Sequence, residues 1–546
     1  MEREELHRRI ELLRKRLEEG NLKVASHHAN DSKKSLLQVR VATDGMVIPE
    51  TVDGRIRSIL SFIAYQSDRE EWKEVVSLSE IQQTYFQRIE HAFGQPFEMM
   101  TEAGADPYKF AGWFASDTSR VADALKVTDE FVPSILEFWE NISEPTWIHL
   151  EDSKYSKAVF SGEIFPDGNS NITSSTGIYF DTTILPDPFV KISSLLQFMS
   201  EEERCYEVLR LGLQVLQYKE LALSEETIPI VAILPDRHQF ESSYRDFVHY
   251  NAEQDSLEHA GILFDTKFEE VEELKFFLSR YNRIESLIGD LKKPDELVFA
   301  TEWEGSLEDH IQRYIDEQPV ELNLTSPGDA IFMHLFTRFA QSNDSFQRSR
   351  GLNGTPIIKA ETSWLWFNWM LRNNSNFLQE DDRKYLHIAR ALNTTVPTEI
   401  SWFGNVTPEA IIEIRKAGAL EEIRDVLGEG VSELISANPD NFFRTGDRVF
   451  HNLDKALSEH QQKIKEIQSK GWKFAGQDVG SFLVVGGIEL TAALTGLPLY
   501  GSLAATAGMS GVVPTAKELK EKLSELRSQS AAASNSGIGI LFKHNH

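Results

Sequence analysis

Two aspartates, each at the end of an apolar segment, are the residues of this sequence that best fit a chemical role. Asp236 follows the run 228–234, IPIVAIL, and Asp265 follows the shorter apolar run 261–264. We expect both runs to be parallel strands, because the stretch between them has a helical pattern. Parallel strands bring their C-terminal ends to one edge of a sheet, where α/β proteins bind ligands. Asp236 and Asp265 are therefore candidate ligands for Mg²⁺, which prefers carboxylate oxygens.

The same residues also suggest a catalytic role. Pro235-Asp236 followed by Asp265-Thr266-Lys267 resembles, in residue order, the PD-(D/E)xK nucleases. The resemblance covers five residues, and here a predicted helix separates elements that adjoin in that family. It implies a metal-dependent phosphodiester hydrolase in which Asp236, Asp265 and Lys267 are catalytic and the two aspartates hold Mg²⁺. The structural alternative is that Asp236 caps a helix and that Asp265 and Lys267 lie at a solvated strand end.

Other motifs with known chemistry are missing from the sequence. His238, His249 and His259 lack the i, i+4 spacing of a metal-binding helix face. The sequence contains no GxxxxGK[ST] loop, no GxSxG elbow and no GxGxxG after a predicted strand. Cys205 is the only cysteine, which excludes intramolecular disulfides and multi-cysteine zinc sites.

The composition indicates a folded, acidic chain. Its 546 residues are 41% hydrophobic and carry a formal net charge of −29. That charge repels phosphate backbones, so nonspecific nucleic-acid binding is not expected. The N-terminal segment is a charged amphipathic helix without the apolar core of a signal peptide. We therefore expect a cytoplasmic protein, either peripheral to the inner membrane or conditionally inserted in it if its most apolar segment acts on lipid.

The hydrophobic pattern predicts a predominantly helical α+β chain with a central α/β part that contains a βαβ unit. Residues 158–165 and 177–185 read as a short antiparallel unit, and 297–300 as a further strand. Aromatic residues at helical spacing in 363–370 predict a buried core helix. The expected domains are a helical domain at 1–145, the α/β domain at 146–305, a helical domain at 306–475, an apolar hairpin with a charged helix at 476–527, and a flexible linker and tail at 528–546.

The segment 481–513 is the most apolar part of the chain. Glu489 is the only charged residue between Asp478 and Lys517. Small residues at close spacing let helices pack tightly, either in lipid or in a protein core. Each half is shorter than the roughly 20 residues that span a bilayer, so a buried hairpin is the alternative to a membrane or oligomerisation segment. The residues assigned to membrane action or self-association are Gly486, Gly487, Glu489, Gly496, Pro498, Gly501 and Gly508.

Three functions follow from these observations. The preferred one is a non-catalytic sensor or effector that binds a protein partner or itself and acts through 481–513, in a setting such as bacterial stress or antiphage defence. The second is the hydrolase with Asp236, Asp265 and Lys267. The third is a scaffold subunit whose helical surfaces assemble a complex.

Overall fold

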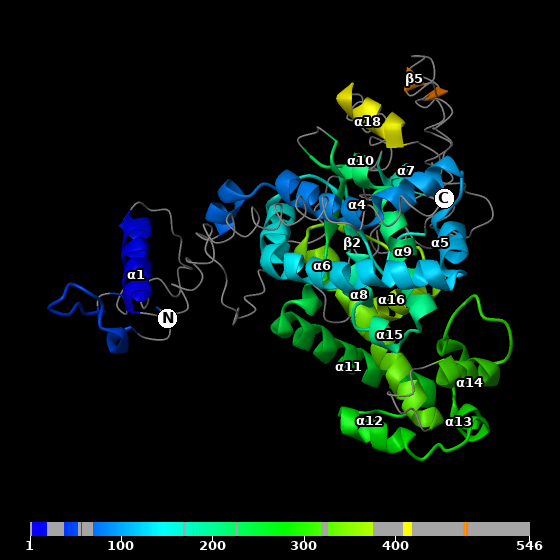
Figure 1. Ribbon diagram of the computed structural model, residues 1–546. Coiled ribbons are helices and arrows are strands. Elements are labelled where there is room, and N and C mark those ends of the chain that lie inside the picture. The colour runs from blue at the N-terminus through cyan, green and yellow to red at the C-terminus, as the bar shows by residue number, and fades with distance from the viewer. Residues whose placement is uncertain are drawn as a thin grey trace, which may run out of the picture. The chain divides into compact units, whose positions relative to one another are not determined.

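The computed structural model describes residues 3–18, 36, 38–52, 56, 69–167, 171–177, 180–224, 228–317, 326–374, 408–417, 473–474 and 477–478. These residues fall into two compact units that divide after Leu78 (Figure 1). The segment 481–513, predicted to be an apolar hairpin, and the tail at 528–546 lie outside the described residues. The described residues are predominantly helical and include a small parallel sheet, as the sequence predicts.

The first unit is built around helix α1 (Arg3–Glu18). One face of α1 is buried against residues that surround the short helix η1 (Pro49–Thr51). Asp44-Gly45 forms a turn in this unit: Asp44 Oδ1 accepts a hydrogen bond from the Met46 amide at 3.0 Å, and Gly45 has a φ of +82°. The buried apolar residues of this unit are Leu6, Ile10, Leu13, Val39, Val47, Val52 and Ile56.

The second unit contains a parallel four-stranded sheet. Its strands are β1 (Lys157–Phe160), β2 (Thr182–Pro186), β3 (Val231–Leu234) and β4 (Thr355–Ile357). They lie in the order β3-β2-β1-β4, and every neighbouring pair is parallel. Every residue of β1, β2 and β3 is buried. Burial on both faces explains why these strands show no alternation of apolar and polar residues, although β1 begins with Lys157 and β2 with Thr182 and Thr183.

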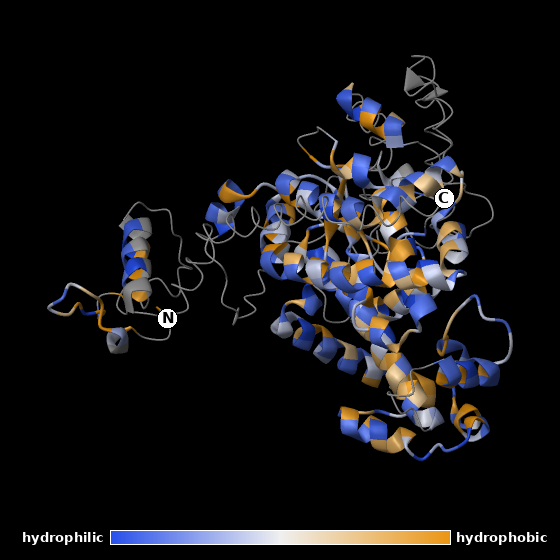
Figure 2. Ribbon diagram, viewed as in Figure 1, coloured by the Kyte–Doolittle hydropathy of each residue, from blue (hydrophilic) through white to orange (hydrophobic). Residues whose placement is uncertain are grey.

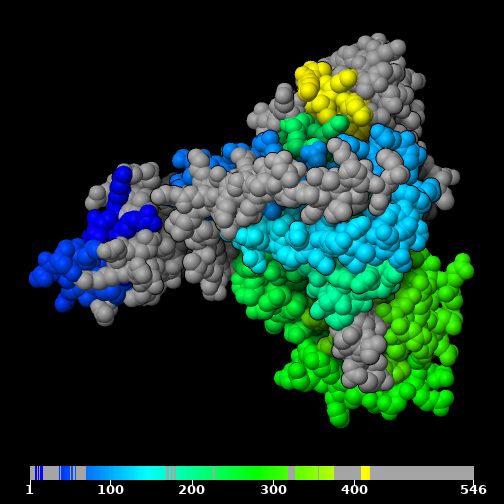
Figure 3. All heavy atoms as spheres, in the orientation of Figure 1, coloured from blue at the N-terminus to red at the C-terminus, as the bar shows by residue number. Residues whose placement is uncertain are grey.

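Helices fill the connections between these strands. Among the described residues of the second unit, three helices precede β1, and four short or medium elements lie between β2 and β3. Figure 3 shows α5 (Pro107–Ala115) and α6 (Thr118–Asp152) as a continuous cyan band of surface, with the green residues from α11 (Ser242–Phe264) to α14 (Leu307–Glu317) below it. The elements are α4 (Leu78–Glu102), α5 (Pro107–Ala115), α6 (Thr118–Asp152), α7 (Thr173–Thr176), α8 (Pro188–Ile192), η2 (Leu196–Phe198), α9 (Glu201–Leu216), α10 (Lys219–Ala222), η3 (Arg237–Gln239), α11 (Ser242–Phe264), α12 (Val271–Leu278), α13 (Ile284–Asp290), η4 (Pro294–Glu296), α14 (Leu307–Glu317), α15 (Pro327–Gly351), α16 (Glu361–Asn374), α18 (Pro408–Lys416), and the small antiparallel strands β5 (Lys473–Phe474) and β6 (Gln477–Asp478).

Two helices of the second unit begin with side-chain caps. Asp187 caps α8, with its Oδ1 accepting the amides of Phe189 and Val190. Ser200 and Glu203 form a capping box at the start of α9. Each of these caps depends only on residues within one turn.

Three strand predictions are wrong. The unit within 158–185 is parallel, because a connection that includes α7 separates β1 from β2. Residues 261–264 are the last turn of α11, where apolar side chains face the core instead of forming a strand. Residues 297–300 form no strand either. The βαβ arrangement is found instead between β2 and β3, whose connection contains α8, α9 and α10.

The predicted aromatic core helix is confirmed as α16. It packs against α11 and α15, and Trp366 and Phe367 are at most 1% exposed. Two buried histidines lie in the same cluster: the His259 ring lies against Trp366 and Trp369, and the His334 ring stacks on Phe299 with 4.1 Å between ring centroids. Figure 2 shows hydrophobic residues gathered along α15 and around the sheet.

Among the described residues, no helix combines the length and the apolar character needed to cross a membrane.

A glutamine side chain closes the outer edge of β3. Gln82 of α4 donates from Nε2 to the Ile233 carbonyl at 2.9 Å, and its Oε1 accepts from the Ile233 amide at 2.8 Å. The side-chain amide therefore takes the place that a further strand would occupy. Covering an edge in this way prevents pairing with another chain.

We expect Gln82→Ala to lower the free energy of unfolding by about 2 to 4 kcal/mol, because it leaves two buried backbone groups of Ile233 without partners. Urea denaturation followed by circular dichroism measures the change. The matched control is Gln83→Ala, whose side chain is exposed one position along the same helix. Equal stabilities of the two variants would contradict the edge-closing role.

The two buried histidines make stability depend on pH. Burial lowers the pKa of His259 to about 4 and that of His334 to about 3. Each ring also lies within hydrogen-bonding distance of a backbone carbonyl: His259 Nε2 is 2.7 Å from Glu296 O, and His334 Nε2 is 2.9 Å from Val298 O. Below pH 6.5 the unfolded chain therefore binds protons that the folded chain does not bind, and acid favours unfolding.

We expect each histidine to contribute a loss of about 1.4 kcal/mol per pH unit as the pH falls from about 6.5 toward its folded pKa. His259→Gln keeps an N–H donor for the Glu296 carbonyl but does not titrate. Its free energy of unfolding should therefore depend less steeply on pH between 6.5 and 4.5 than that of the wild type. Urea titrations at several pH values test this, with His249→Gln on the exposed face of α11 as the control. Parallel pH profiles of wild type and His259→Gln would rule the explanation out.

Candidate functional site

Asp236 lies at the carboxyl end of β3 in a buried ion cluster. Its side chain is 2% exposed and makes an ion pair with the equally buried Arg348 of α15. Lys191 of α8 approaches from another side, with Nζ 3.3 Å from Asp236 Oδ2. Arg348 also donates from Nη2 to the Leu234 carbonyl at 2.7 Å. One carboxylate therefore joins the end of a strand to two helices.

The charges around Asp236 keep it ionised. Burial alone raises the pKa of a carboxyl group. Here the charges of Lys191 and Arg348 outweigh burial and lower the pKa of Asp236 below its usual value. A buried carboxylate that stays charged has to be paired, and removing either partner leaves the other uncompensated.

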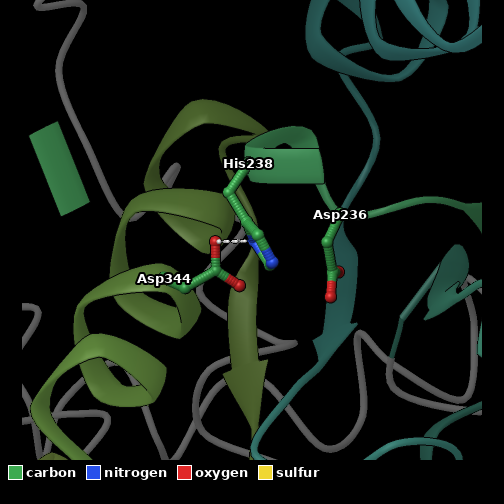
Figure 4. Close-up of side chains that lie close together, drawn as sticks. All are labelled: Asp236, His238 and Asp344. Atoms are coloured by element: carbon green, nitrogen blue, oxygen red, sulfur yellow. Dashed lines mark hydrogen bonds and ion pairs between the residues drawn. The ribbon is translucent and has the colours of Figure 1, made fainter. Parts of the chain in front are cut away.

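A histidine and a second aspartate lie beside this cluster. His238 stands on η3, two residues after Asp236, and its Nδ1 is 3.2 Å from Asp344 Oδ1 on α15. Burial lowers the pKa of His238, but the hydrogen bond and charge of Asp344 outweigh it and raise the pKa above the usual value. Figure 4 shows the imidazole ring between the two carboxylates. One ligand atom from each of the three side chains lies within 4.8 Å of the others.

Asp265 and Lys267 do not join this cluster. Asp265 is exposed and ends α11 in a left-handed conformation with φ of 51°. The 23 residues of α11 separate it from the end of β3, and at about 1.5 Å per residue this helix is about 35 Å long. Lys267 is also exposed, and its Nζ lies 2.8 Å from Glu269 Oε1. The predicted pair of strand ends fails because 261–264 belongs to a helix. The helix-cap alternative for Asp236 fails as well, because its side chain caps no amide of η3.

The carboxyl end of β2 is closed by hydrogen bonds. Asp187 is buried, and its Oδ2 accepts from Trp139 Nε1 at 2.7 Å while Oδ1 caps α8. Burial raises the pKa of Asp187. This aspartate therefore holds α6 and α8 together at the sheet edge.

Side-chain hydrogen bonds also close the carboxyl end of β1. The Gly162 carbonyl accepts from Gln341 Nε2 at 2.8 Å and from Ser363 Oγ at 2.7 Å. Gly162 has a φ of +83°, and a Cβ atom there would lie 2.8 Å from Ile358. Glycine is therefore required where α16 meets the edge between β1 and β4. In an open sheet of this strand order, that position is the crevice where ligands bind.

The sequence contains only part of the information needed to find this site. Asp236 is found because it follows an apolar strand. The i, i+4 spacing of metal-binding helices does not reveal His238, whereas its place two residues after a strand end does. Asp344 and Arg348 lie four residues apart, which places them on one face of α15. Nothing in the sequence, however, links that face to β3.

Comparisons with known proteins add no assignment to this geometry: no family model matches the chain, and no significant match was found among curated proteins or solved structures.

We expect Asp236→Asn to lower the free energy of unfolding by about 3 to 5 kcal/mol, because it leaves Arg348 charged and uncompensated in the core. The control, Asp265→Asn, changes an exposed carboxylate and should stay within about 0.5 kcal/mol of the wild type. Chemical denaturation of the two variants provides the comparison. Similar stabilities would show that the Asp236–Arg348 pair is not structural.

Proposed function

We propose that this chain is a cytoplasmic sensor or effector that acts by binding a protein partner or itself. Its second unit serves as a rigid binding body, and residues 481–513 act on a membrane or on other copies of the chain. Bacterial stress response or antiphage defence is the setting that we propose for such a multidomain chain. The function does not depend on catalysis.

The observation that supports a binding role is the use of the polar groups at the strand ends. In an α/β enzyme, the carboxyl edge of the parallel sheet presents groups that can react with a substrate. Here Asp187 and Asp236 are both buried and are engaged by Trp139, Lys191 and Arg348. These strand-end carboxylates hold helices against the sheet, which favours a scaffold for recognition over a reactive site.

The composition of 481–513 supports an effector role for the C-terminal part. A charged side chain at the centre of a lipid bilayer costs about 2.5 to 3.5 kcal/mol on insertion scales. Glu489 is the only residue of the segment that carries such a charge, and protonation removes it. A weakly apolar, glycine-rich segment with one titratable charge suits conditional insertion or self-association.

Dye release from anionic liposomes tests this function with the full chain. We expect leakage or salt-resistant vesicle association that disappears when the chain is truncated after Lys470. Glu489→Lys should abolish leakage, because a lysine in the apolar segment opposes insertion. Glu518→Lys makes the same charge change outside 481–513 and should leak like the wild type.

Analytical ultracentrifugation of the same variants separates self-association from membrane action. Assembly without leakage that is lost on truncation supports the oligomer form of the proposal. If the full chain is inert and monomeric, while truncation makes it aggregate, 481–513 is a buried core element and the effector proposal fails.

The alternative is the metal-dependent phosphodiester hydrolase, which now retains only Asp236 of its three predicted residues. The observation that favours it is the position of His238 and Asp344 beside Asp236 at the carboxyl edge. Hydrolysis of a phosphodiester or of single-stranded DNA with Mg²⁺ is the assay. Activity that is lost in His238→Gln and kept in Asp265→Asn would support the hydrolase over the effector.

A further inference from the structure

The cluster of Asp236, His238 and Asp344 has the donors of a cation site. It offers two carboxylates and one imidazole from two distant parts of the chain, the end of β3 with η3 and the middle of α15. We propose that these three side chains bind one divalent transition-metal ion, such as Mn²⁺ or Zn²⁺. The ion would join the carboxyl edge of the sheet to α15.

The distances between the donors suit a shared ion. Two ligands that each lie about 2.1 Å from a metal are separated by at most about 4.2 Å. His238 Nδ1 and Asp344 Oδ1 are already 3.2 Å apart. All three donors lie within 4.8 Å of one another, so closing on an ion requires movements of only a few tenths of an ångström. His238 and Asp344 are 27% and 17% exposed, which leaves these side chains room to move.

A tyrosine hydroxyl gives independent evidence for an additional ligand here. The Tyr244 hydroxyl oxygen is buried and has no hydrogen-bond partner among the described residues. Burial raises the pKa of Tyr244, the charges of Asp344 and Asp236 raise it further, and the charges of Arg237 and Arg348 lower it. A buried hydroxyl without a partner is destabilising. A water molecule bound to the ion would supply the missing acceptor.

The chemistry of the donors indicates the kind of ion. Lys191 and Arg348 carry two positive charges, and Asp236 and Asp344 carry two negative charges, so these four groups sum to zero before an ion binds. His238 is the only ion-pair partner of Asp344 that the described residues show. The imidazole favours Mn²⁺ or Zn²⁺ over Mg²⁺, which prefers a shell made entirely of oxygen.

The histidine also has the hydrogen bonds that metal-binding histidines need. Such a histidine holds the ion with one nitrogen and a hydrogen-bond partner with the other. Nδ1 of His238 faces Asp344, and Nε2 lies 2.8 Å from the side-chain nitrogen of Gln239. The Gln239 amide nitrogen can only donate, so Nδ1 can bind the ion with Nε2–H oriented by this neighbour once the amide group turns to present its oxygen. If Nε2 binds the ion instead, Nδ1–H stays oriented by the Asp344 carboxylate.

Metal titration of the full chain after treatment with EDTA tests the proposal. Free Mn²⁺ is followed by electron paramagnetic resonance, and Zn²⁺ by competition with a chromophoric chelator. We expect one saturable site in the wild type and at least about tenfold weaker binding in His238→Gln and in Asp344→Asn. His249→Gln and Asp265→Asn change exposed residues elsewhere and should bind as the wild type does.

The variants avoid Asp236 because its replacement disturbs Arg348. Circular dichroism of the metal-free proteins establishes that His238→Gln and Asp344→Asn fold. Added Mn²⁺ should raise the melting temperature of the wild type and leave that of both variants unchanged. The proposal is overturned if the wild type has no saturable site or if both variants bind like the wild type. No substrate or vesicle is present, so the result is independent of the effector assay.

Discussion

The buried ion pair between Asp236 and Arg348 is the contact on which the second unit depends. It connects residues 112 positions apart, and the same guanidinium also binds the Leu234 carbonyl. A buried pair gains little net energy over an apolar contact, but it tolerates only one geometry. The pair therefore fixes the end of β3 against α15, and α15 leads directly into β4 on the opposite edge of the sheet.

The helix α15 has two halves with different roles. In its first half Ile331, Leu335 and Phe339 are fully buried in the aromatic cluster with α11 and α16. Its second half buries polar residues, each of which has at least one partner: Ser342 Oγ donates to Arg338 O, Asn343 Nδ2 donates to Asp255 Oδ2, Ser345 Oγ donates to Gln341 O, Arg348 pairs with Asp236, and Ser349 Oγ donates to Ser345 O. Hydrogen-bonded polar groups of this kind determine which surfaces pack together, because each group needs a particular partner. Apolar side chains need only to be buried and are less selective.

The fold was predictable where signals are local and failed where they are long-range. Parts of the predicted segments 158–165 and 228–234 are strands, namely β1 and β3, because apolar β-branched segments suit a buried sheet. The run ending at Phe264 is also short and apolar but completes a long helix. Periodicity over so few residues cannot separate a buried strand from a buried helix turn. The strand β4 was missed because it has three residues, of which Pro356 cannot donate to a ladder.

The site was predictable only in part for a related reason. Asp236 can be identified because it follows a predicted strand. Its partners cannot be identified in this way, because they depend on how the chain folds between β3 and β4. That path brings α15, more than 100 residues later, across the carboxyl edge of β3.

The same path of the chain explains why this sheet edge differs from that of an open α/β enzyme. Where a ligand would approach the strand ends, α8, α15 and α16 supply Lys191, Arg348 and Ser363 from within the chain. Asp344 is part of that covering layer and is 17% exposed, so this point of the edge keeps an acidic group accessible to solvent.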